Sequence, residues 1–463
     1  MHHSGDTICA CATPPGAGAV SIVRISGPKA LEVADGVIAF KGGTARSFAG
    51  YSLHYATVPG LDDVMVSIFR APHSYTGEDS VEISCHASAY VVSELLARLM
   101  QAGARMAEPG EFTRRAFLNG KMDLCQAEAV ADMIAADSEV SHDVALRHLK
   151  GAYSDSLRAL RDSLVDITSL LELELDFSEE DVEFADRGHL LELLDEAIEH
   201  IEALAGSFKD GNALRRGVPV AIVGAPNCGK STLLNALLGD DRALVSDIPG
   251  TTRDTVEETM VLEGVTYRFI DTAGLRETDQ TVERMGIERS LEKLAGADIV
   301  LCVVDATLPT EEAFSTVREV VSRMDTGRQT LILLRNKIDL VPGTTASTFS
   351  NLPSDTPVLD LSALTGAGLD ELRAQIASLS RTRFGGLNAG GEIVTNLRHY
   401  EALTAALESL KVVRAGLKRH ISGDLLAEDM RAAISSLNSI FGENLIDTDT
   451  ILGRIFSRFC IGK

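Results

Sequence analysis

The stretch "VPVAIVGAPNCGKSTLLNALLG", residues 218–239, joins a β-branched run, a glycine-rich loop and an apolar helical pattern. Its loop "GAPNCGKS" fits the phosphate-binding motif G-x-x-x-x-G-K-S/T, which requires this strand–loop–helix context. Glycines let backbone N–H groups at a helix N-terminus point at phosphates. Lys230 is expected to reach the outer phosphates, and the Ser231 hydroxyl to bind Mg²⁺. The stretch therefore predicts an α/β domain with a P-loop nucleotide site.

Two later motifs indicate which nucleotide is bound. The motif "RFIDTAG" ends a strand at Asp271, an acid that can support Mg²⁺ through its water shell, and Gly274 can bring its N–H to the γ-phosphate. The motif "LILLRNKID" ends another strand with Asn336, Lys337 and Asp339. The Asp339 carboxylate can accept from two donors of guanine, and adenine offers no such pair. The motifs therefore predict GTP rather than ATP, bound as in a Ras-like GTPase.

The loop motifs leave the catalytic group open. Signalling GTPases place a Gln after D-x-x-G to orient water, and Leu275 occupies that position here. Either hydrolysis is slow or another group acts, and the charged candidates just downstream are Arg276, Glu277, Asp279, Glu283 and Arg284.

Two further loops are expected to contact the nucleotide or its metal ion. The loop "VSDIPGTTRD" supplies Thr252 as a second Mg²⁺ ligand. Ser362 and Ala363 could offer a backbone N–H to the guanine carbonyl.

Length and composition indicate a multidomain folded protein. The 463 residues are 45% hydrophobic and 24% charged, which predicts two to four domains. No apolar run approaches the ~20 residues of a membrane span, and the N-terminus has no secretion signal. The seven cysteines form no CxxC pair. These features predict a cytoplasmic protein with reduced thiols.

The negative charge is concentrated in one segment. The net charge is −24, and residues 166–202 contain 14 acidic residues against a single Arg187. A long non-specific nucleic-acid surface needs the opposite sign, and a solvated helical face is the simpler interpretation. Any RNA is therefore expected to bind this protein over a small local surface or to be bound mainly by a partner protein.

Periodicity divides the chain into α/β and helical parts. Strand-like runs alternate with helical stretches before residue 120, residues 124–205 are helical, and strand–helix alternation occupies 218–380 before helices return. An α/β block bracketed by helical segments suggests an inserted domain. The predicted domains are an N-terminal domain (1–120), a helical domain in two parts (121–215 and 382–463) and an inserted G domain (216–381).

Several outer segments resemble one family. They are "ATPPG", "SIVRISG", "SYTGEDSVEISCH", "EPGEFTRRAFLNGKMDLCQAEAVADMI", "VERMGIER" and "ILGRIFSRFCIGK". Together with the GTPase motifs they resemble, over essentially the whole chain, the MnmE (TrmE) family of tRNA wobble-uridine modification GTPases. The resemblance implies a tetrahydrofolate-binding-like N-terminal domain that forms the homodimer, a helical domain from two segments and an inserted Ras-like GTPase domain.

The resemblance also implies partners and cofactors. The family works with a flavoprotein, MnmG (GidA), in a heterotetramer that adds an aminomethyl or carboxymethylaminomethyl group to wobble uridine of certain tRNAs. A reduced folate, formyl- or methylene-tetrahydrofolate, supplies the one-carbon unit, while the partner carries FAD and uses NADH. GTP hydrolysis with Mg²⁺ and K⁺ drives the conformational cycle.

Site residues carried over by the resemblance fall into three sets. The catalytic residues are Lys230 and Glu283, and the K⁺ ligands are Asn227 with backbone at Ser246, Ile248 and Thr251. The residues expected to bind GTP are Asn227, Cys228, Gly229, Lys230, Ser231, Thr232, Ser246, Thr251, Thr252, Asp271, Gly274, Asn336, Lys337, Asp339, Ser362 and Ala363. The folate residues are Arg24, Glu82, Lys121 and Lys463, although Ala17 and Ala19 depart from the family's loop after "TPPG".

The cysteines have separate interpretations. As a C-a-a-X box, Cys460–Lys463 would be prenylated, but Gly462 and a terminal Lys fit that motif poorly. A frayed tail is the plain alternative, whereas the resemblance implies that Cys460 lies at the substrate centre. Cys9 and Cys11 on a strand and Cys302 in "DIVLCVV" are expected in the core.

Two other functions remain open from the sequence. A regulatory GTPase, such as a ribosome-assembly factor, would bind no folate. A folate-dependent aminomethyl transferase with a dispensable GTPase would modify tRNA without the P-loop lysine.

Overall fold

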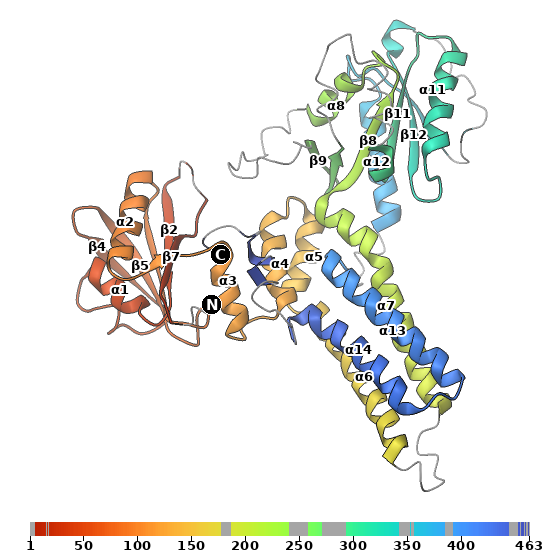
Figure 1. Ribbon diagram of the computed structural model, residues 1–463. Helices are drawn as coiled ribbons and strands as arrows, with labels where there is room; N and C mark the ends of the chain where they lie inside the picture. The colour runs from red at the N-terminus through yellow and green to blue at the C-terminus, as the bar shows by residue number, and fades with distance from the viewer. Residues whose placement is uncertain are drawn as a thin grey trace. The chain divides into compact units, whose positions relative to one another are not determined.

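The computed structural model describes most of the chain, and Figure 1 labels its elements. The described residues are 5–14, 16, 18–176, 187–239, 258–270, 293–341, 352, 356–384, 392–443, 452–453, 455–457, 459 and 462. Contacts divide the chain into two compact units. Unit 1 consists of Met1–Ile134, Leu146–Leu194 and Glu408–Lys463, and unit 2 of Ala135–Ala145 and Asp195–Leu407.

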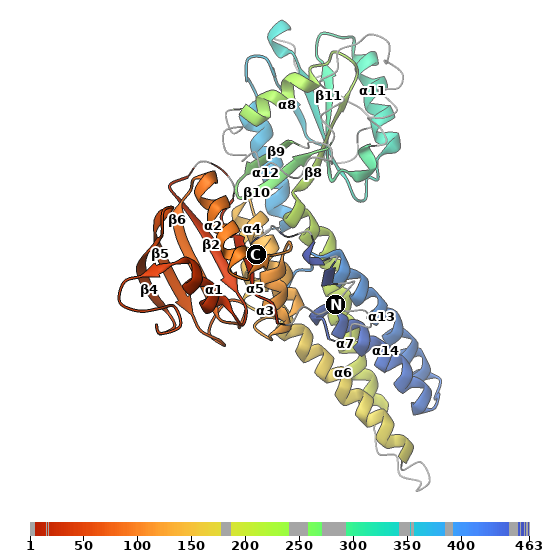
Figure 2. The same ribbon diagram turned by 60° about the vertical axis from the view of Figure 1, so that its left-hand side comes forward.

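A seven-stranded sheet forms the N-terminal part of unit 1, in the order β3-β4-β5-β6-β2-β1-β7 (Figure 2). Neighbouring strands are antiparallel except for the parallel pair β1 and β7. The strands are β1 (Ile8–Cys11), β2 (Val20–Ser26), β3 (Ala39–Phe40), β4 (Ser52–Val58), β5 (Asp62–Phe69), β6 (Ser80–His86) and β7 (Arg105–Met106). The strand-like runs predicted before residue 120, "LHYATV", "DVMVSIF" and "SVEISCH", are therefore confirmed as β4, β5 and β6.

Two helices cover one face of this sheet, α1 (Ala30–Val37) and α2 (Ala89–Gln101). Alternation along β5 shows which face is covered, because Val64 and Val66 are buried in this core while Met65 is exposed. Leu53 and Tyr55 on β4 are also exposed, at 61% and 47% of their surface. The sheet therefore has one buried face and carries exposed apolar side chains on β4 and β5.

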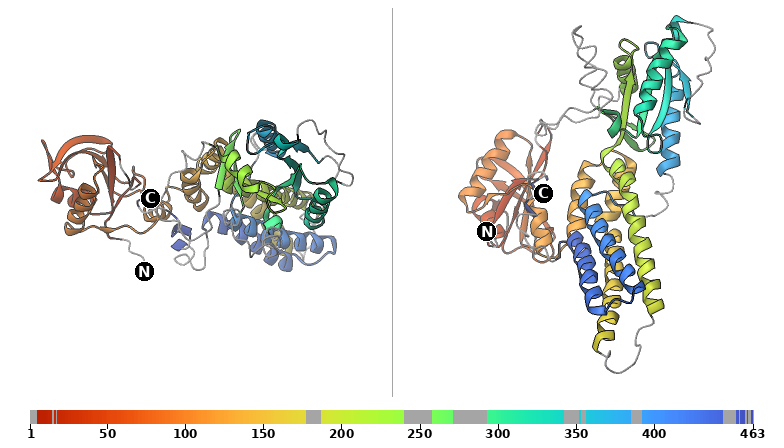
Figure 3. Two further views of the ribbon diagram at one scale, coloured as in Figure 1. Left: turned by 90° about the horizontal axis from the view of Figure 1, so that it is seen from above. Right: turned by 45° about the vertical axis from the view of Figure 1, so that its right-hand side comes forward.

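Helices form the rest of unit 1. They include α3 (Glu111–Leu118), α4 (Leu124–Ala135), α6 (Ala152–Asp176) and α14 (Gly423–Phe441). Within the predicted helical region 124–205, α6 buries an apolar stripe of Leu157, Leu160, Leu164, Ile167 and Leu171, and it lies beside α14 (Figure 3). Leu452 and Phe456 pack with Leu124, so the end of the chain returns to the start of α4.

A six-stranded sheet forms the α/β part of unit 2, in the order β13-β12-β11-β8-β10-β9. All pairs are parallel except β10 and β9, as expected for a P-loop domain. The strands are β8 (Val218–Gly224), β9 (Glu258–Leu262), β10 (Val265–Phe269), β11 (Ile299–Asp305), β12 (Thr330–Asn336) and β13 (Val358–Asp360).

Helices cover both faces of this sheet. The helices α8 (Lys230–Leu238) and α12 (Leu369–Phe384) share one core with Leu301 and Val303 of β11. The helix α11 (Thr310–Arg323) shares the other core with Val300 and Cys302. Because β11 is buried on both sides, its sequence is a continuous apolar run rather than an alternating one.

The helical part of unit 2 packs beside this α/β part. It contains residues 195–216 of α7 (Arg187–Arg216) and residues 397–407 of α13 (Leu397–Lys418). The Val394 N–H donates to Ser207 Oγ at 3.0 Å, and the rings of Phe208 and Tyr400 stack at 4.6 Å. A Cβ atom on Gly211 would overlap the Val394 carbonyl, which fixes glycine at this approach.

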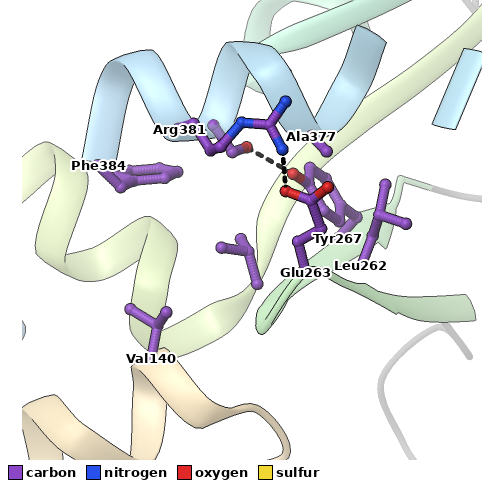
Figure 4. Close-up of a pocket in the computed structure, with 9 residues that line it drawn as sticks. Val140, Leu262, Glu263, Tyr267, Ala377, Arg381 and Phe384 are labelled. Atoms are coloured by element: carbon purple, nitrogen blue, oxygen red, sulfur yellow. Dashed lines mark hydrogen bonds and ion pairs between the residues drawn. The ribbon is translucent and has the colours of Figure 1, made fainter. Parts of the chain in front are cut away.

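The β9–β10 hairpin is bonded to the residues at the start of α5 (Glu139–Leu149). The Val140 N–H donates to the Gly264 carbonyl at 3.2 Å, and Thr266 Oγ1 donates to Asp137 Oδ1 at 2.6 Å. A pocket of about 70 Å³ lies beside this contact, lined by residues that include Val140, Tyr267 and Phe384 (Figure 4). None of the predicted site residues lines it. In the described ranges, no helix is both long and apolar enough to cross a bilayer.

Candidate functional site

The predicted phosphate loop connects β8 to α8. Two of its glycines are held where a side chain would not fit, since Gly224 and Gly229 have φ values of +155° and +99°. A Cβ atom on Gly224 would overlap the Val303 carbonyl, and one on Gly229 would overlap Asn336 Nδ2. The backbone of the loop therefore lies directly against β11 and the end of β12, as a phosphate cradle requires.

Lys230 begins α8 and bends back over the loop. Its Nζ donates to the carbonyls of Gly224 at 3.0 Å and Ala225 at 2.8 Å. The ammonium is thus held over the loop at the positive end of the α8 dipole, where an anion is favoured. Ser231 and Thr232 occupy the first turn of the same helix.

Cys228 contributes to the site through its backbone. Its side chain is buried, and burial raises the pKa of its thiol despite the nearby Lys230. Its carbonyl accepts from Asn336 Nδ2 at 2.8 Å, while Asn336 Oδ1 accepts from the Ala363 N–H at 2.9 Å. Asn336 therefore ties the phosphate loop and the loop after β13 to the end of β12.

The N–H groups of Ser362 and Ala363, predicted to face the guanine carbonyl, bond within the protein in this structure. The Ser362 N–H donates to the Ala367 carbonyl at 2.9 Å, and that of Ala363 is bonded to Asn336. The Ala363 N–H satisfies the buried Asn336 amide, and the Ser362 N–H closes the turn to Ala367. The contact of either N–H group with the guanine carbonyl stays a prediction.

Lys337 and Asp339 follow Asn336 in a tight turn. Lys337 adopts a left-handed backbone with φ +70°, and its Nζ donates to Asp305 Oδ2 at 2.6 Å. The side chain of Asp339 is exposed. Sequence reasoning missed Asp305, because only the pairing of β11 with β12 brings the end of β11 next to the guanine motif.

The Asp305 carboxylate is fixed on both oxygens. Thr307 donates to Oδ1 through its N–H at 2.9 Å and its hydroxyl at 2.7 Å. Burial opposes ionisation, but the hydrogen bonds from Lys337 and Thr307 outweigh it and hold the pKa of Asp305 below its usual value. Asp305 is therefore a charged, oriented partner for Lys337.

Other predicted nucleotide and metal residues lie outside the described residues. They are Ser246, Ile248, Thr251, Thr252, Asp271, Gly274 and Glu283. Of the predicted metal ligands, the structure describes Ser231 for Mg²⁺ and Asn227, with φ +59°, for K⁺. No group of three or more His, Cys, Asp or Glu side chains among the described residues could hold a metal ion. The ligands predicted for Mg²⁺ and K⁺ are instead hydroxyl, amide and carbonyl oxygens, which such a group would not include.

A second cluster lies in unit 1, where Arg24 of β2 is directly opposite Glu82 of β6. Arg24 Nε donates to Glu82 Oε1 at 2.8 Å, and both side chains are partly exposed. The guanidinium lies 5.4 Å from the Tyr75 ring and 5.5 Å from the Phe112 ring. A paired charge flanked by two aromatic rings is a suitable setting for a flat, polar heterocycle.

The predicted folate residues are only partly brought together. Lys121 Nζ donates to the Pro72 carbonyl at 3.1 Å and thus contacts the loop that carries Tyr75. Gly462 packs against the backbone of Cys11, and its carbonyl accepts from Arg24 Nη1 at 3.5 Å. Tyr75 and Phe112 were missed in the sequence, because aromatic residues on a loop and a helix carry no pattern of their own.

The C-terminal candidates Lys463 and Cys460 lie outside the described residues. The prediction of core cysteines holds for Cys9 and Cys302, where burial raises the thiol pKa to about 11 and about 12. It is wrong for Cys11, which is only half-buried because it ends β1, and its Sγ donates to the Thr13 carbonyl at 3.4 Å.

Two family models match the chain. The GTP-binding protein TrmE N-terminus matches residues 7–121, and the MnmE helical domain matches residues 124–460. A tRNA modification GTPase MnmE from Bacteroides fragilis (strain YCH46) is 47% identical over 469 residues, covering 99% of both chains. The chain belongs to the MnmE family. The MnmE of Bacteroides thetaiotaomicron is 46% identical, again over 99% of each chain.

Membership of the MnmE family confirms the enzyme class predicted from the motifs, a GTP hydrolase, and its part in tRNA modification. Among solved structures, the G domain of the T. maritima FeoB iron transporter is 28% identical, covers 35% of this chain and 97% of its own, and has a TM-score of 0.24. The predicted mixture of an N-terminal part, a helical part and an α/β G domain agrees with the MnmE family match.

Proposed function

We infer that the protein couples GTP hydrolysis to the addition of an aminomethyl or carboxymethylaminomethyl group to wobble uridine of tRNA, in the cytoplasm. A flavoprotein of the MnmG (GidA) type, carrying FAD, is the partner, and a reduced folate supplies the one-carbon unit. One observation supports this proposal most strongly. A single chain of the MnmE family contains both a phosphate loop bonded to Asn336 and an Arg24–Glu82 ion pair beside aromatic rings.

The nucleotide site has a role for each element. Lys230 and the N-terminus of α8 bind the outer phosphates, and Asp339 accepts from the donor edge of guanine. Ser231 and Thr252 would hold Mg²⁺, which neutralises charge on the phosphates. The domain is inserted between the two segments of the helical domain, so nucleotide-driven movement reaches both.

Potassium would be held by the Asn227 side chain and by backbone carbonyls at Ser246, Ile248 and Thr251. Charge developing on the phosphates would be neutralised there, a role in which an arginine finger is worth about 10³–10⁵ in rate. Glu283 orients the attacking water, since Leu275 cannot. The left-handed Asn227 is compatible with a side-chain oxygen beside the loop.

The cation role predicts faster hydrolysis in K⁺ than in Na⁺ buffer, because the smaller ion fits a carbonyl cage of this kind poorly. Turnover is measured at saturating GTP and matched ionic strength in both salts. Asn227→Ala should remove the difference, and equal rates in the unmodified protein would exclude the K⁺ site. Glu283→Ala should lower turnover with GTP affinity nearly unchanged.

The folate site is proposed on the Arg24–Glu82 cluster. A pterin presents a donor edge that the Glu82 carboxylate can accept, and Tyr75 and Phe112 supply apolar walls. Arg24, Lys121 and Lys463 suit the glutamate tail or a formyl oxygen. Cys460 is proposed at this substrate centre, and the position of Gly462 beside Arg24 supports that placement.

Homodimerisation is proposed through the N-terminal domain. Leu53, Tyr55 and Met65 are exposed apolar side chains on neighbouring strands of its sheet. Contiguous exposed apolar surface of this kind marks a protein interface. The acidic balance of the chain supports a tRNA held mainly by the flavoprotein.

Reconstitution tests the function directly. Purified protein, the flavoprotein, reduced folate, GTP and tRNA are combined, and modified uridine is measured by mass spectrometry. A regulatory GTPase would show no saturable binding of reduced folate, and Glu82→Gln would then change nothing. A transferase with a dispensable GTPase would keep modification after Lys230→Ala. We expect folate binding that Glu82→Gln weakens and modification that Lys230→Ala abolishes.

A further inference from the structure

The guanine motif and the end of β11 meet at one edge of the sheet. Strands β11 and β12 are parallel, and Asp305 is directly opposite Asn336 in their register. The Ala306 N–H donates to the Asn336 carbonyl at 2.9 Å, which extends the pairing past the end of the strand. Lys337, one residue further, is therefore placed beside Asp305 by the sheet itself.

The Asp305 carboxylate presents one oxygen to Lys337 and the other to Thr307. Its side chain is 10% exposed and that of Lys337 is 30% exposed, so the ion pair is sheltered from water. Sheltered charge-assisted hydrogen bonds are about twice as strong as neutral ones. This pair holds the Lys337 ammonium more firmly than an exposed surface pair would.

Fixing the Lys337 ammonium has two consequences for a bound base. A free lysine side chain has many rotamers, and holding it in one of them beforehand removes that entropy cost from nucleotide binding. Lys337 also lies two residues from Asp339, the expected guanine acceptor. An ammonium bonded to Asp305 leaves the Asp339 carboxylate available to the donors of the base.

We propose that Asp305, supported by Thr307, is a positioning residue for guanine-nucleotide binding. It acts through Lys337, holding the lysine stem as one wall of the base site and keeping its ammonium away from Asp339. Asp305 itself does not contact the nucleotide. The inference rests on the proposed binding of guanine nucleotide at this edge and assigns the affinity and base selectivity of that site to a residue outside the guanine motif.

The test is Asp305→Asn in the full-length protein, with fluorescent GDP as the probe. We expect GDP affinity to fall about tenfold, because the neutral amide gives Lys337 a weaker partner. The ratio of GDP to inosine diphosphate affinity should shrink, since inosine lacks the amino group that Asp339 reads. Turnover at saturating GTP should stay within about twofold, because the phosphate loop is intact.

A control and a double mutant separate positioning from general damage. Asp298→Asn removes a carboxylate just before the other end of β11, where it bonds Arg383 at 2.8 Å, and should leave GDP affinity unchanged. In a Lys337→Met background, Asp305→Asn should have no further effect. An equal loss in that background, a loss matched by Asp298→Asn, or unchanged selectivity would overturn the inference. Absence of GDP binding by the unmodified protein would instead overturn the proposed function.

Discussion

At the residue scale, Gly229 shows how closely the phosphate loop approaches the guanine motif. Gly229→Ala would place a Cβ atom on Asn336 Nδ2 at a backbone φ of +99°. We expect GDP binding to fall at least a hundredfold, because the Asn336 bond to the loop must break. Gly103→Ala is the matched control, with φ +109° and open space around the new atom. It should cost about 1–2 kcal/mol of stability and leave nucleotide binding intact.

Glu111 supports a second residue-scale prediction, in unit 1. It is buried and bonded to Arg105 at 2.5 Å and Arg115 at 3.0 Å. Burial opposes its ionisation, but the hydrogen bonds from Arg105 and the Glu108 N–H hold its pKa below the usual value. The folded pKa is thus below the unfolded one, so its stabilisation is complete above about pH 4.5 and is lost as pH falls through the folded pKa.

Glu111→Gln should therefore destabilise the N-terminal sheet at pH 7 by about 2 kcal/mol, because Arg105 and Arg115 lose their buried carboxylate partner and keep only Asp6 and Glu78. The difference from the unmodified protein should narrow as pH falls below 4. Hydrogen exchange of β1 and β7 amides measures both effects locally. Glu108→Gln, at an exposed carboxylate, should change exchange little at any pH. A difference in exchange between Glu111→Gln and the unmodified protein that does not change with pH would show that the charge of Glu111 is not what stabilises the sheet.

Single residues also show what sequence alone can predict. Lys230, Asn336 and Asp339 follow from motifs whose spacing along the chain is itself the chemical requirement. Asp305 and Tyr75 do not, because their positions depend on which strand ends and loops meet in three dimensions. Glu283 and Thr252 remain predictions, since they lie outside the described residues.

At the element scale, close packing of α7 on residues 393–394 gives a prediction with an internal control. Gly211→Ala should destabilise the protein by about 1–3 kcal/mol, because its Cβ would overlap the Val394 carbonyl. Gly206→Ala, on the same helix with open space, should stabilise it by about 0.5–1 kcal/mol. Thermal unfolding should show a lower melting temperature for Gly211→Ala and a higher one for Gly206→Ala than for the unmodified protein. Equal changes in melting temperature for the two variants would contradict the close packing of Gly211 against Val394.

Elements with a clear apolar period were predicted well. The region predicted to be helical over residues 124–205 contains α6 with its buried stripe, and the strand-like run "DVMVSIF" forms β5. The bond between Thr266 and Asp137 gave no such signal, because a polar residue in a hairpin is ordinarily assigned to the surface.

At the scale of the whole molecule, the proposed dimer can be broken by charge. Leu53→Glu combined with Tyr55→Glu places two carboxylates on the exposed apolar strand β4. We expect the sedimentation coefficient to fall from that of a dimer to that of a monomer. The strands β2 and β6, which carry the Arg24–Glu82 pair, should stay folded. Lys29→Glu, at an exposed position before α1 on the other face of the sheet, is a control for added charge on the same domain. A dimer that survives both β4 substitutions would place the interface elsewhere.

The division into units shows where sequence reasoning stops. The domain boundaries predicted at residues 121, 216 and 382 stay predictions. Contacts divide the chain in another way, at the last residue of α4 and within α5, α7 and α13. A helical pattern identifies an apolar face but does not say which neighbour covers each half of a long helix. The position of these divisions therefore emerges only from the packing.

The two bonds that join the β9–β10 hairpin to Asp137 and Val140 have a mechanical consequence. The hairpin connects the chain segments that carry Thr252 and Asp271, so any sliding of its strands along β8 must either rupture those bonds or drag the first turn of α5 with it.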